Sequence, residues 1–551
     1  MKKLIFLSAA MLLLITASCG NDENINNPND AKQTVHFSFT NEDFGADEPL
    51  SRTSAPATKT QTQTIDLGDC EAEICVESEP AIKTRGTLTN ANGHYTILAY
   101  QGGTLKGEVK GTFSGGAFTA DAGVAKNLNL APGTYDFIAF NDDVIPSGSE
   151  LTVARDKAET ARMGFATKVI TATPQKQEVM FTMKHVGARL RTQFICQKHL
   201  PNNITSTLEA TAANVIPTNV AYDPATKTYT ATNGAMATIS NNSPASTETK
   251  YYASNGGKDY AYTSTSDYHY FLPTTEGSKL RLTGISAGTV FWNPIPTFNV
   301  AQLNATLTMQ ANKSYLVKIK LKPNYTYLMS DGSTGFFRET TFGGGTKTPI
   351  AVVLNKYSHI AVALNNASPR QTPWCDSKYS SIGTNTYGTA SNVSQNDALY
   401  GFLMKRGIDE TWDASYTTSA VTDEKIKGKN PDFTTFYAAA NYNPGVSYTG
   451  SPALQWYLPS SSDYKEVLSN LGFGTFQIPA PGWVVRCESY NELIWSAFTQ
   501  VGGVSFPTGC WTSSAVGDYA AAIVVANQTS ITWDHEGKNV PHNWTRAFVK
   551  Y

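Results

Sequence analysis

The sequence predicts a mainly β protein in which β-sandwich domains precede a loop-rich α+β domain. Only 16% of the 551 residues are charged, while Thr, Ser, Asn, Gly and Tyr are plentiful, a composition typical of exported β-rich proteins. Short runs that alternate apolar and polar residues recur up to Pro323, and no long amphipathic helical pattern precedes that residue. After Pro323 tryptophan becomes frequent and short helical patterns occur, so we expect a different architecture there. At ordinary domain sizes, a chain of this length makes about three domains.

The first residues direct the chain to export. Two lysines precede an apolar run from Leu4 to Ile15, and small residues then lead to Cys19. This arrangement predicts a secretory signal at residues 1–18, with an apolar run too short to span a bilayer. A cysteine at the first mature position resembles a bacterial lipobox, and the acidic residues behind it resemble the surface-export signal of Bacteroidetes lipoproteins. The resemblance implies lipidation of Cys19 and an outer membrane lipoprotein precursor; an ordinary signal peptide with a chance cysteine is the alternative.

The charge balance restricts the classes of partner. The chain has 43 basic and 45 acidic residues, and loss of Lys2 and Lys3 with the signal leaves 41 basic residues against 45 acidic ones. A nearly balanced, slightly acidic chain is not expected to bind nucleic acid or to lie on a membrane through a basic face. We therefore expect membrane contact only through the lipid anchor of the precursor.

Six cysteines follow Cys19, and an even number in an exported protein permits three disulfides. They are Cys70, Cys75, Cys196, Cys375, Cys487 and Cys510. Cys70 and Cys75 are near enough in sequence to close a small loop, and Cys487 and Cys510 share one C-terminal segment, so these four are the disulfide candidates. Cys196 and Cys375 fall in different predicted domains, which argues against their pairing. Spacing alone leaves the connectivity open.

The segment between the signal and residue 86 is polar but contains one clear strand pattern. Val35, Phe37 and Phe39 alternate with polar residues at the period of two that a strand requires. A second short apolar run covers residues 74–76, and the Thr-rich stretch 53–64 is predicted to be a linker.

Further alternating runs predict the strands of the sandwich domains. They cover residues 94–100, 134–140, 179–183, 188–194, 280–282 and 315–321. The last run is a regular half-buried strand pattern that Pro323 closes.

The C-terminal part mixes helix and strand patterns. Residues 461–471 repeat apolar residues with a helical period behind a candidate capping residue, Ser461. Residues 490–498 carry a weaker helical pattern. Strand patterns return at residues 521–526, 530–533 and 544–551.

Three motifs in the first part of the chain resemble the fimbrillin superfamily of Bacteroidetes. They are PGTYDF at residues 132–137, MKHVGARL at 183–190 and LVKIKLK at 316–322. In that family the first motif belongs to an N-terminal transthyretin-like sandwich, the second opens another sandwich, and the third is its last strand. The resemblance implies two transthyretin-like β-sandwich domains, at residues 86–180 and 181–323, behind a lipidated leader at residues 19–85.

Three further motifs resemble the C-type-lectin-like domains of bacterial surface proteins. They are QWYLPS at residues 455–460, WTSS at 511–514 and RAFV at 546–549. The resemblance implies an α+β C-type-lectin-like domain over residues 324–551. Calcium-binding lectins of that fold use a Glu-Pro-Asn or Gln-Pro-Asp loop with a Trp-Asn-Asp strand. This sequence has neither motif, so the resemblance does not extend to calcium-dependent sugar binding.

The fimbrillin resemblance also implies assembly by strand exchange. In that family an Arg-specific protease removes an N-terminal strand, and a stalk pilin then donates a strand to the exposed groove. Residues 35–39 are the candidate removable strand, and Arg85 is the candidate cleavage site, with Arg52 as the alternative. The chain continues from the second sandwich to residue 551 without an evident donor strand. We therefore expect an adhesin at the tip of a fimbria on the cell surface, which contacts a host or bacterial surface protein or glycan.

The sequence offers no catalytic constellation. It has no His-Glu-x-x-His pair and no Gly-x-Ser-x-Gly elbow, so we expect no enzyme, no metal and no cofactor. Trp374, Trp412 and Trp533 are candidates for a platform that stacks on sugar rings, although core packing is the simpler expectation for the tryptophans as a set. The alternative function is a surface lipoprotein that never polymerises and binds glycan through its C-terminal domain. An enzyme in that domain would need a metal or thiol site that the sequence does not provide.

Overall fold

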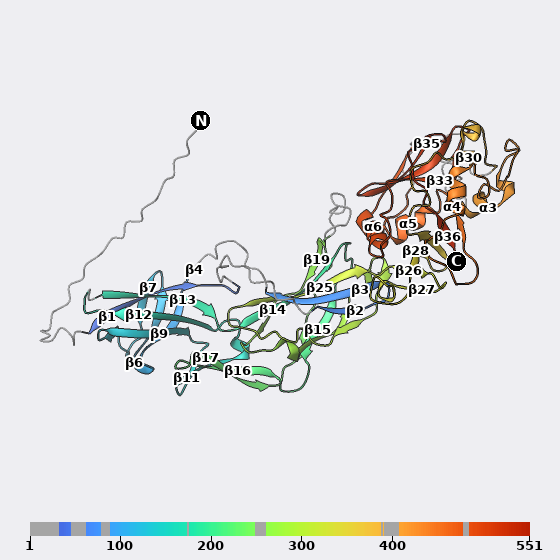
Figure 1. The fold of residues 1–551 in the computed structure, drawn as a ribbon. Helices are drawn as coiled ribbons and strands as arrows, with labels where there is room; N and C mark the ends of the chain where they lie inside the picture. Colours follow the sequence, from blue (N-terminus) through green and yellow to red (C-terminus); the bar gives the residue numbers. More distant parts are fainter. Residues whose placement is uncertain are drawn as a thin grey trace, which may run out of the picture. The chain divides into compact units, whose positions relative to one another are not determined.

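Strands dominate the part of the chain that the computed structural model describes (Figure 1). The described residues are 32–45, 62–78, 89–173, 176–247, 260–386, 389–390, 407–477 and 484–551. They form several sheets, and their α-helices begin only at Gly407, so a mainly β protein with a small helical content near the C-terminus is confirmed. Within the described residues, one compact unit takes its chain from residues 32–45, 89–187 and 219–231, and a second unit takes the rest.

The first unit contains a nine-stranded sheet in the order β4-β1-β13-β12-β9-β5-β6-β7, with β8 paired to β1. Its strands are β1 (Gln33–Asn41), β4 (Thr89–Asn90), β5 (Gly93–Gln101), β6 (Thr104–Ser114), β7 (Ala117–Ala120), β8 (Leu128–Leu130), β9 (Gly133–Asn141), β12 (Arg162–Ile170) and β13 (Lys176–His185). Alternate apolar residues of these strands meet in one core, because successive side chains of a strand point to opposite faces.

A second sheet has four strands in the order β10-β11-β16-β17; β10 and β11 belong wholly to the first unit, while β16 and β17 extend beyond its bounds. They are β10 (Ile145–Ser147), β11 (Glu150–Ala154), β16 (Ile216–Asp223) and β17 (Thr228–Gly234). The domain boundary predicted at residue 180 is wrong, because β13 continues through it and pairs with β1 and β12 as far as His185. The change of unit follows Gly187, where an added Cβ would meet the backbone oxygen of Ala158 at 2.0 Å. Only glycine, which has no Cβ, therefore fits at residue 187.

The second unit begins with two sheets that enclose one core. The first has the order β19-β14-β25-β3-β2, with β20 paired to β14, and the other has the order β18-β15-β21-β24. Their strands are β2 (Gln63–Asp66), β3 (Cys70–Ser78), β14 (Ala188–Cys196), β15 (Thr205–Ala210), β18 (Ile239–Ser240), β19 (Tyr262–Thr265), β20 (His269–Phe271), β21 (Leu280–Ser286), β24 (Phe298–Val300) and β25 (Ser314–Pro323). A small ribbon of β22 (Thr289–Val290) and β23 (Asn293–Pro294) accompanies them. The strand predicted at residues 315–321 is confirmed as β25.

The remainder of the second unit combines two sheets with short helices. One sheet has the order β27-β26-β28-β29-β36-β31 and the other β30-β33-β34-β35-β32. The strands are β26 (Thr326–Met329), β27 (Thr334–Phe336), β28 (Pro349–Asn355), β29 (Ile360–Ala363), β30 (Thr389–Ala390), β31 (Gln455–Tyr457), β32 (Val485–Glu488), β33 (Gly509–Val516), β34 (Ala520–Ala526), β35 (Ser530–Gly537) and β36 (Phe548–Lys550). The helices are α3 (Gly407–Trp412), α4 (Thr434–Ala440), α5 (Tyr464–Asn470) and α6 (Asn491–Thr499).

Both helices predicted in this region are present as α5 and α6, and one detail of the prediction is wrong. The residue at the N-terminus of α5 is Asp463, not Ser461. Ser461 is fully buried, and its hydroxyl lies 3.2 Å from that of Thr512. Among the described residues, no helix is both long and apolar enough to cross a membrane.

Candidate functional site

The leader strand β1 lies inside the sheet of the first unit, with both of its edges paired. It runs parallel to β13, from Thr34 opposite Lys176 to Asn41 opposite Met183. Its other edge pairs antiparallel with β8 over its first residues and with β4 over its last ones. Removal of β1 would therefore open a gap bounded by unpaired main-chain groups.

The side chains of β1 supply a large part of the core of the first unit. Val35 is 3% exposed, Phe37 8% and Phe39 2%. The ring centroid of Phe39 lies 4.8 Å from that of Tyr95 and 5.3 Å from that of Phe181. Three pockets at alternate positions would thus be emptied with the strand, and a replacement would have to fill them.

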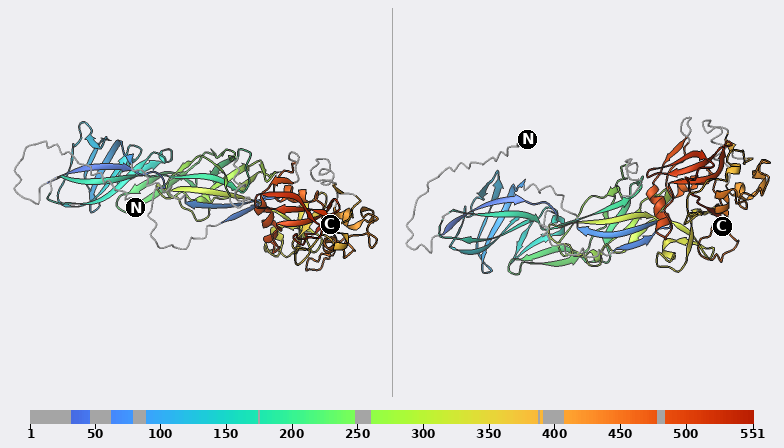
Figure 2. Two further views of the ribbon diagram at one scale, coloured as in Figure 1. Left: turned by 90° about the horizontal axis from the view of Figure 1, so that it is seen from above. Right: turned by 45° about the horizontal axis from the view of Figure 1, so that its top comes forward.

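A second part of the leader, the hairpin of β2 and β3, belongs to the second unit. Figure 1 and both views of Figure 2 show a blue strand, β3, among the green and yellow strands of that unit. It pairs antiparallel with β25 over nine residues, from Cys70 opposite Pro323 to Ser78 opposite Tyr315. Ala72 and Ile74 are fully buried in the core there.

Charged pairs accompany the contact between β3 and β25. Lys318 Nζ lies 2.6 Å from Glu77 Oε2, and Lys322 pairs with Glu73. These are diagonal neighbours across the strands, a separation that long side chains can span. The alternating lysines of β25 face the alternating glutamates of β3, so a sequence signal for this pairing existed, although our sequence analysis missed it.

The turn of the hairpin is bonded to the chain that follows β25. The amide of Asn324 donates to Asp69 O at 3.0 Å, and its side chain donates to Gly68 O at 3.0 Å. Arg338 and Asp66 form an ion pair with an N–O distance of 2.6 Å. The hairpin is therefore fixed at its strand and at its turn.

The predicted disulfides are wrong, because the six described cysteines are free thiols. Cys70 and Cys75 lie five positions apart on one extended strand, which separates their Cα atoms by about 16 Å, and a disulfide needs less than about 7 Å. Cys487 is on β32 and Cys510 on β33, and β34 and β35 lie between those strands. Burial raises the pKa of Cys196, Cys375 and Cys510 to about 12, which disfavours the reactive thiolate form.

The predicted sugar platform is not formed by the three tryptophans proposed for it. Trp374 is 0% exposed and Trp533 is 1% exposed, so neither ring presents a face to solvent. The Trp374 indole donates to Thr512 O at 2.7 Å, and the Trp533 indole donates to Ser461 O at 2.9 Å. Trp412 is half-buried and donates to the carbonyl of Trp456 at 2.8 Å. These rings hold the domain together, as core packing predicts.

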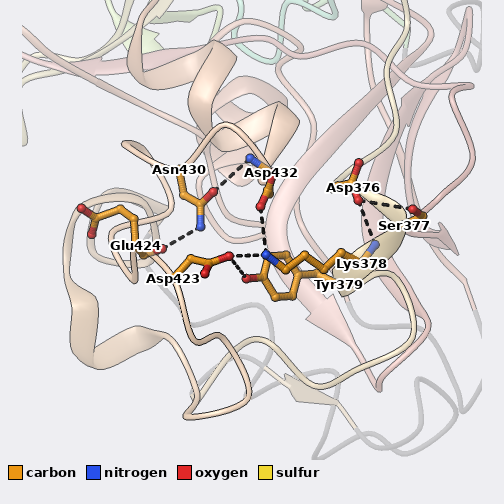
Figure 3. Close-up of polar contacts among 8 residues, drawn as sticks. All are labelled: Asp376, Ser377, Lys378, Tyr379, Asp423, Glu424, Asn430 and Asp432. Carbon is orange, nitrogen blue, oxygen red and sulfur yellow. Dashed lines mark hydrogen bonds and ion pairs between the residues drawn. The ribbon is translucent and has the colours of Figure 1, made fainter.

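A polar cluster on the surface of the same region joins two loops (Figure 3). Lys378 Nζ pairs with Asp423 and lies 3.5 Å from Asp432 Oδ2, while the Tyr379 hydroxyl donates to Asp423 at 2.9 Å. The hydrogen bond to Asp423 raises the pKa of Lys378, and the same bond lowers the pKa of Asp423. Both groups therefore stay charged at neutral pH, which suits an ion-pair brace and not proton transfer.

Cys19, Arg52 and Arg85 lie outside the described residues. Among the residues that are described, no group of His, Cys, Asp and Glu has the arrangement of a metal site.

No family model matches this chain, and no curated protein sequence matches it. Solved structures that this chain resembles include fimbrial and adhesion proteins of Bacteroides and Parabacteroides. A candidate cell adhesion protein from Bacteroides uniformis is 17% identical, with 42% of this chain and 92% of that chain covered and a TM-score of 0.27. A fimbrial protein from Bacteroides ovatus is 9% identical, with 95% and 99% covered and a TM-score of 0.22. A fimbrial assembly protein from Parabacteroides distasonis is 7% identical, with 50% and 100% covered and a TM-score of 0.24.

Proposed function

We propose that this chain is a fimbrial tip subunit, an adhesin exported as a lipoprotein that accepts a strand from a stalk pilin after its own β1 is removed. The place of β1 carries the proposal, because a strand from the leader fills an interior position of a sheet and is paired on both edges. A donated strand would restore the main-chain hydrogen bonds and refill the pockets of Val35, Phe37 and Phe39.

The pairing of β36 supports the tip position. β36 pairs with β29 on one side and with β31 on the other, so it is already used within its own sheet. A strand that is paired on both sides is not available to a neighbouring subunit, so β36 is not a donor strand. The C-terminal region would then be presented to a host or bacterial surface protein or glycan.

The two parts of the leader make different demands on the cleavage site. A cut after Arg85 would separate β1, β2 and β3 from the chain together, whereas a cut after Arg52 would separate β1 alone. Loss of β3 would also remove Ile74 from the core of the second unit and break two ion pairs. We therefore propose a cut after Arg52, the alternative in the sequence analysis, in preference to Arg85.

N-terminal sequencing with intact-mass measurement tests the proposal on protein recovered from the surface of the native host. A start at Thr53, with the acylated segment gone, is the expected result. A start at Gly86 would retain strand exchange but move the cut to Arg85. An intact chain that begins at acylated Cys19 would overturn the mechanism and favour a lipoprotein that never polymerises.

A further inference from the structure

Three residues of the first unit hold the C-terminal end of the leader strand. Arg162 begins β12, and Lys184 and His185 end β13. We call these three residues the end clamp. They contact the segment Glu42–Phe44, which directly follows β1.

The end clamp contacts both the main chain and the side-chain charge of Glu42. Arg162 Nη1 donates to Glu42 O at 3.0 Å, and Lys184 Nζ lies 3.4 Å from Glu42 Oε1. The amide of Glu42 donates to Met183 O at 2.9 Å, so the chain follows β13 for one residue beyond β1. The carboxylate at this position thus meets one cation, Lys184, while Arg162 holds the main-chain carbonyl of the same residue.

The end clamp also contacts an aromatic ring, that of Phe44. Phe44 is 7% exposed, and its ring stacks on that of His185 with centroids 3.6 Å apart and planes 13° apart. His185 Nδ1 lies 2.7 Å from Glu159 O, and its Nε2 lies 2.8 Å from Arg162 Nη2. The carbonyl acceptor assigns a proton to Nδ1, while Nε2 faces both Arg162 Nη2 and Asp43 Oδ1, the latter at 3.6 Å. These contacts fix the ring as an aromatic surface for Phe44.

The end clamp is held by its own unit and not only by the leader. Arg162 is also 3.4 Å from Met183 O, its amide donates to Asn141 Oδ1 at 2.9 Å, and it pairs with His185 across the two strands. Its geometry would therefore persist when the leader leaves. Lys184 would then lose its ion pair with Glu42, and the buried ring of Phe44 would leave a surface for another ring.

We propose that the end clamp selects the donor strand, an inference that rests on the proposed function and names the chemistry of the partner. The partner strand runs parallel to β13, as β1 does, and carries apolar residues at three alternate positions. A carboxylate follows the last of these by three residues, and an aromatic residue follows it by five, as Glu42 and Phe44 follow Phe39. The pockets of Val35, Phe37 and Phe39 accept any strand that has apolar residues at alternate positions. The end clamp restricts both the direction and the register of that strand.

Peptide exchange on the full chain tests this inference. A specific protease site is placed between residues 47 and 60, the chain is cut, and fluorescent peptides of residues 32–45 compete for the gap. We expect a peptide that carries both Glu42→Ala and Phe44→Ala to bind about 10- to 100-fold more weakly than the native peptide. Because these changes are in the peptide, they cannot unfold the chain.

A charge exchange supplies the second measurement. Lys184→Glu in the chain should weaken the native peptide about fivefold, and a Glu42→Lys peptide should restore part of that loss. Lys168→Glu is the matched control, since Lys168 is an exposed lysine six residues along β12 from the clamp residue Arg162 and pairs with Tyr135 of β9; it should leave the binding unchanged.

The outcomes separate the two proposals. Equal binding of the native and doubly substituted peptides, or tight binding of a reversed-sequence peptide, would overturn the role of the end clamp and leave strand acceptance intact. Binding of no peptide at all would overturn strand acceptance, and the present inference with it.

Discussion

The two leader strands, β1 and β3, are held in their sheets in different ways. β1 places aromatic rings in a core, and its charged contacts lie at its C-terminal end. β3 is joined to β2 in a hairpin, carries ion pairs along its contact with β25, and has its turn bonded to Asn324. A strand held by apolar alternation can be replaced by another of the same pattern, whereas a hairpin held by charges in register is harder to replace. The difference supports our proposal that β1 is exchanged while β3 stays in the fold.

The largest expected effect is on β1. Phe39→Ala removes a ring that is 2% exposed and contacts three other rings, so it should destabilise the first unit by about 3–5 kcal/mol. Hydrogen exchange followed by mass spectrometry should show faster exchange in β5, β9 and β13 and unchanged exchange in the second unit. Met180→Ala is the control, because Met180 is 74% exposed on β13, and it should change the stability by less than about 0.5 kcal/mol. Equal acceleration of exchange in both units would contradict the assignment of Phe39 to the core of the first unit alone.

The complementary substitution is in β3. Ile74→Ala should destabilise the second unit by about 2–5 kcal/mol, because Ile74 is fully buried between two sheets. Exchange should quicken in β14 and β25 while the first unit keeps its protection. Thr64→Ala, on the exposed face of β2, is the matched control with little expected effect. If Ile74→Ala left β25 protected, β3 would be an accessory strand, and a cut after Arg85 would become the better proposal.

A smaller effect is expected from the charges between β3 and β25. Lys318→Glu places a like charge diagonal to Glu77 and should cost about 1 kcal/mol, since both partners are partly exposed and screened by solvent. The double variant with Glu77→Lys should regain most of that loss in a denaturation experiment, because uncharged residues, Cys75 and Leu316, lie directly opposite the two positions. Independent, additive losses would show that these side chains do not set the register.

The sequence predicted the strands well and their partners poorly, and the physical reason is visible in particular residues. The alternation of β1 and of β25 follows from burial of one face, which the local sequence encodes. The pairing of β3 with β25 joins segments far apart in the chain, and local periodicity carries no information about a distant partner. The complementary charges of Glu73 and Lys322 were the available signal.

The candidate site was predicted in the same uneven way. The period of Val35, Phe37 and Phe39 identified β1 as a strand, but nothing local indicated that Arg162 and His185 would hold its end. The burial of Trp374 and Trp533 also depends on strands that are distant in sequence. The same holds for Cys487 and Cys510, because their separation is set by two strands that lie between them.

The smallest expected effect is a pH dependence confined to the first unit. His94 Nδ1 lies 2.6 Å from Asp142 Oδ1, and Nε2 lies 2.9 Å from Asp121 Oδ2. The hydrogen bonds to Asp142 and then Asp121 raise the pKa of His94 above its ordinary value of 6.5. A raised pKa in the folded state means that this stabilisation is complete below about pH 6.5 and is lost as the pH rises through the folded-state pKa.

Because His94 is partly exposed, the loss should be about 1 kcal/mol or less. Amide exchange of β5 and β9, corrected for the intrinsic rate, should therefore quicken slightly from pH 6 to pH 8.5 relative to that of β14 and β25. His94→Gln should remove this difference, because the amide stays neutral over the whole interval. If alkaline pH loosened β25 as much as β9, the response could not come from His94, since His94 lies on β5 of the first unit.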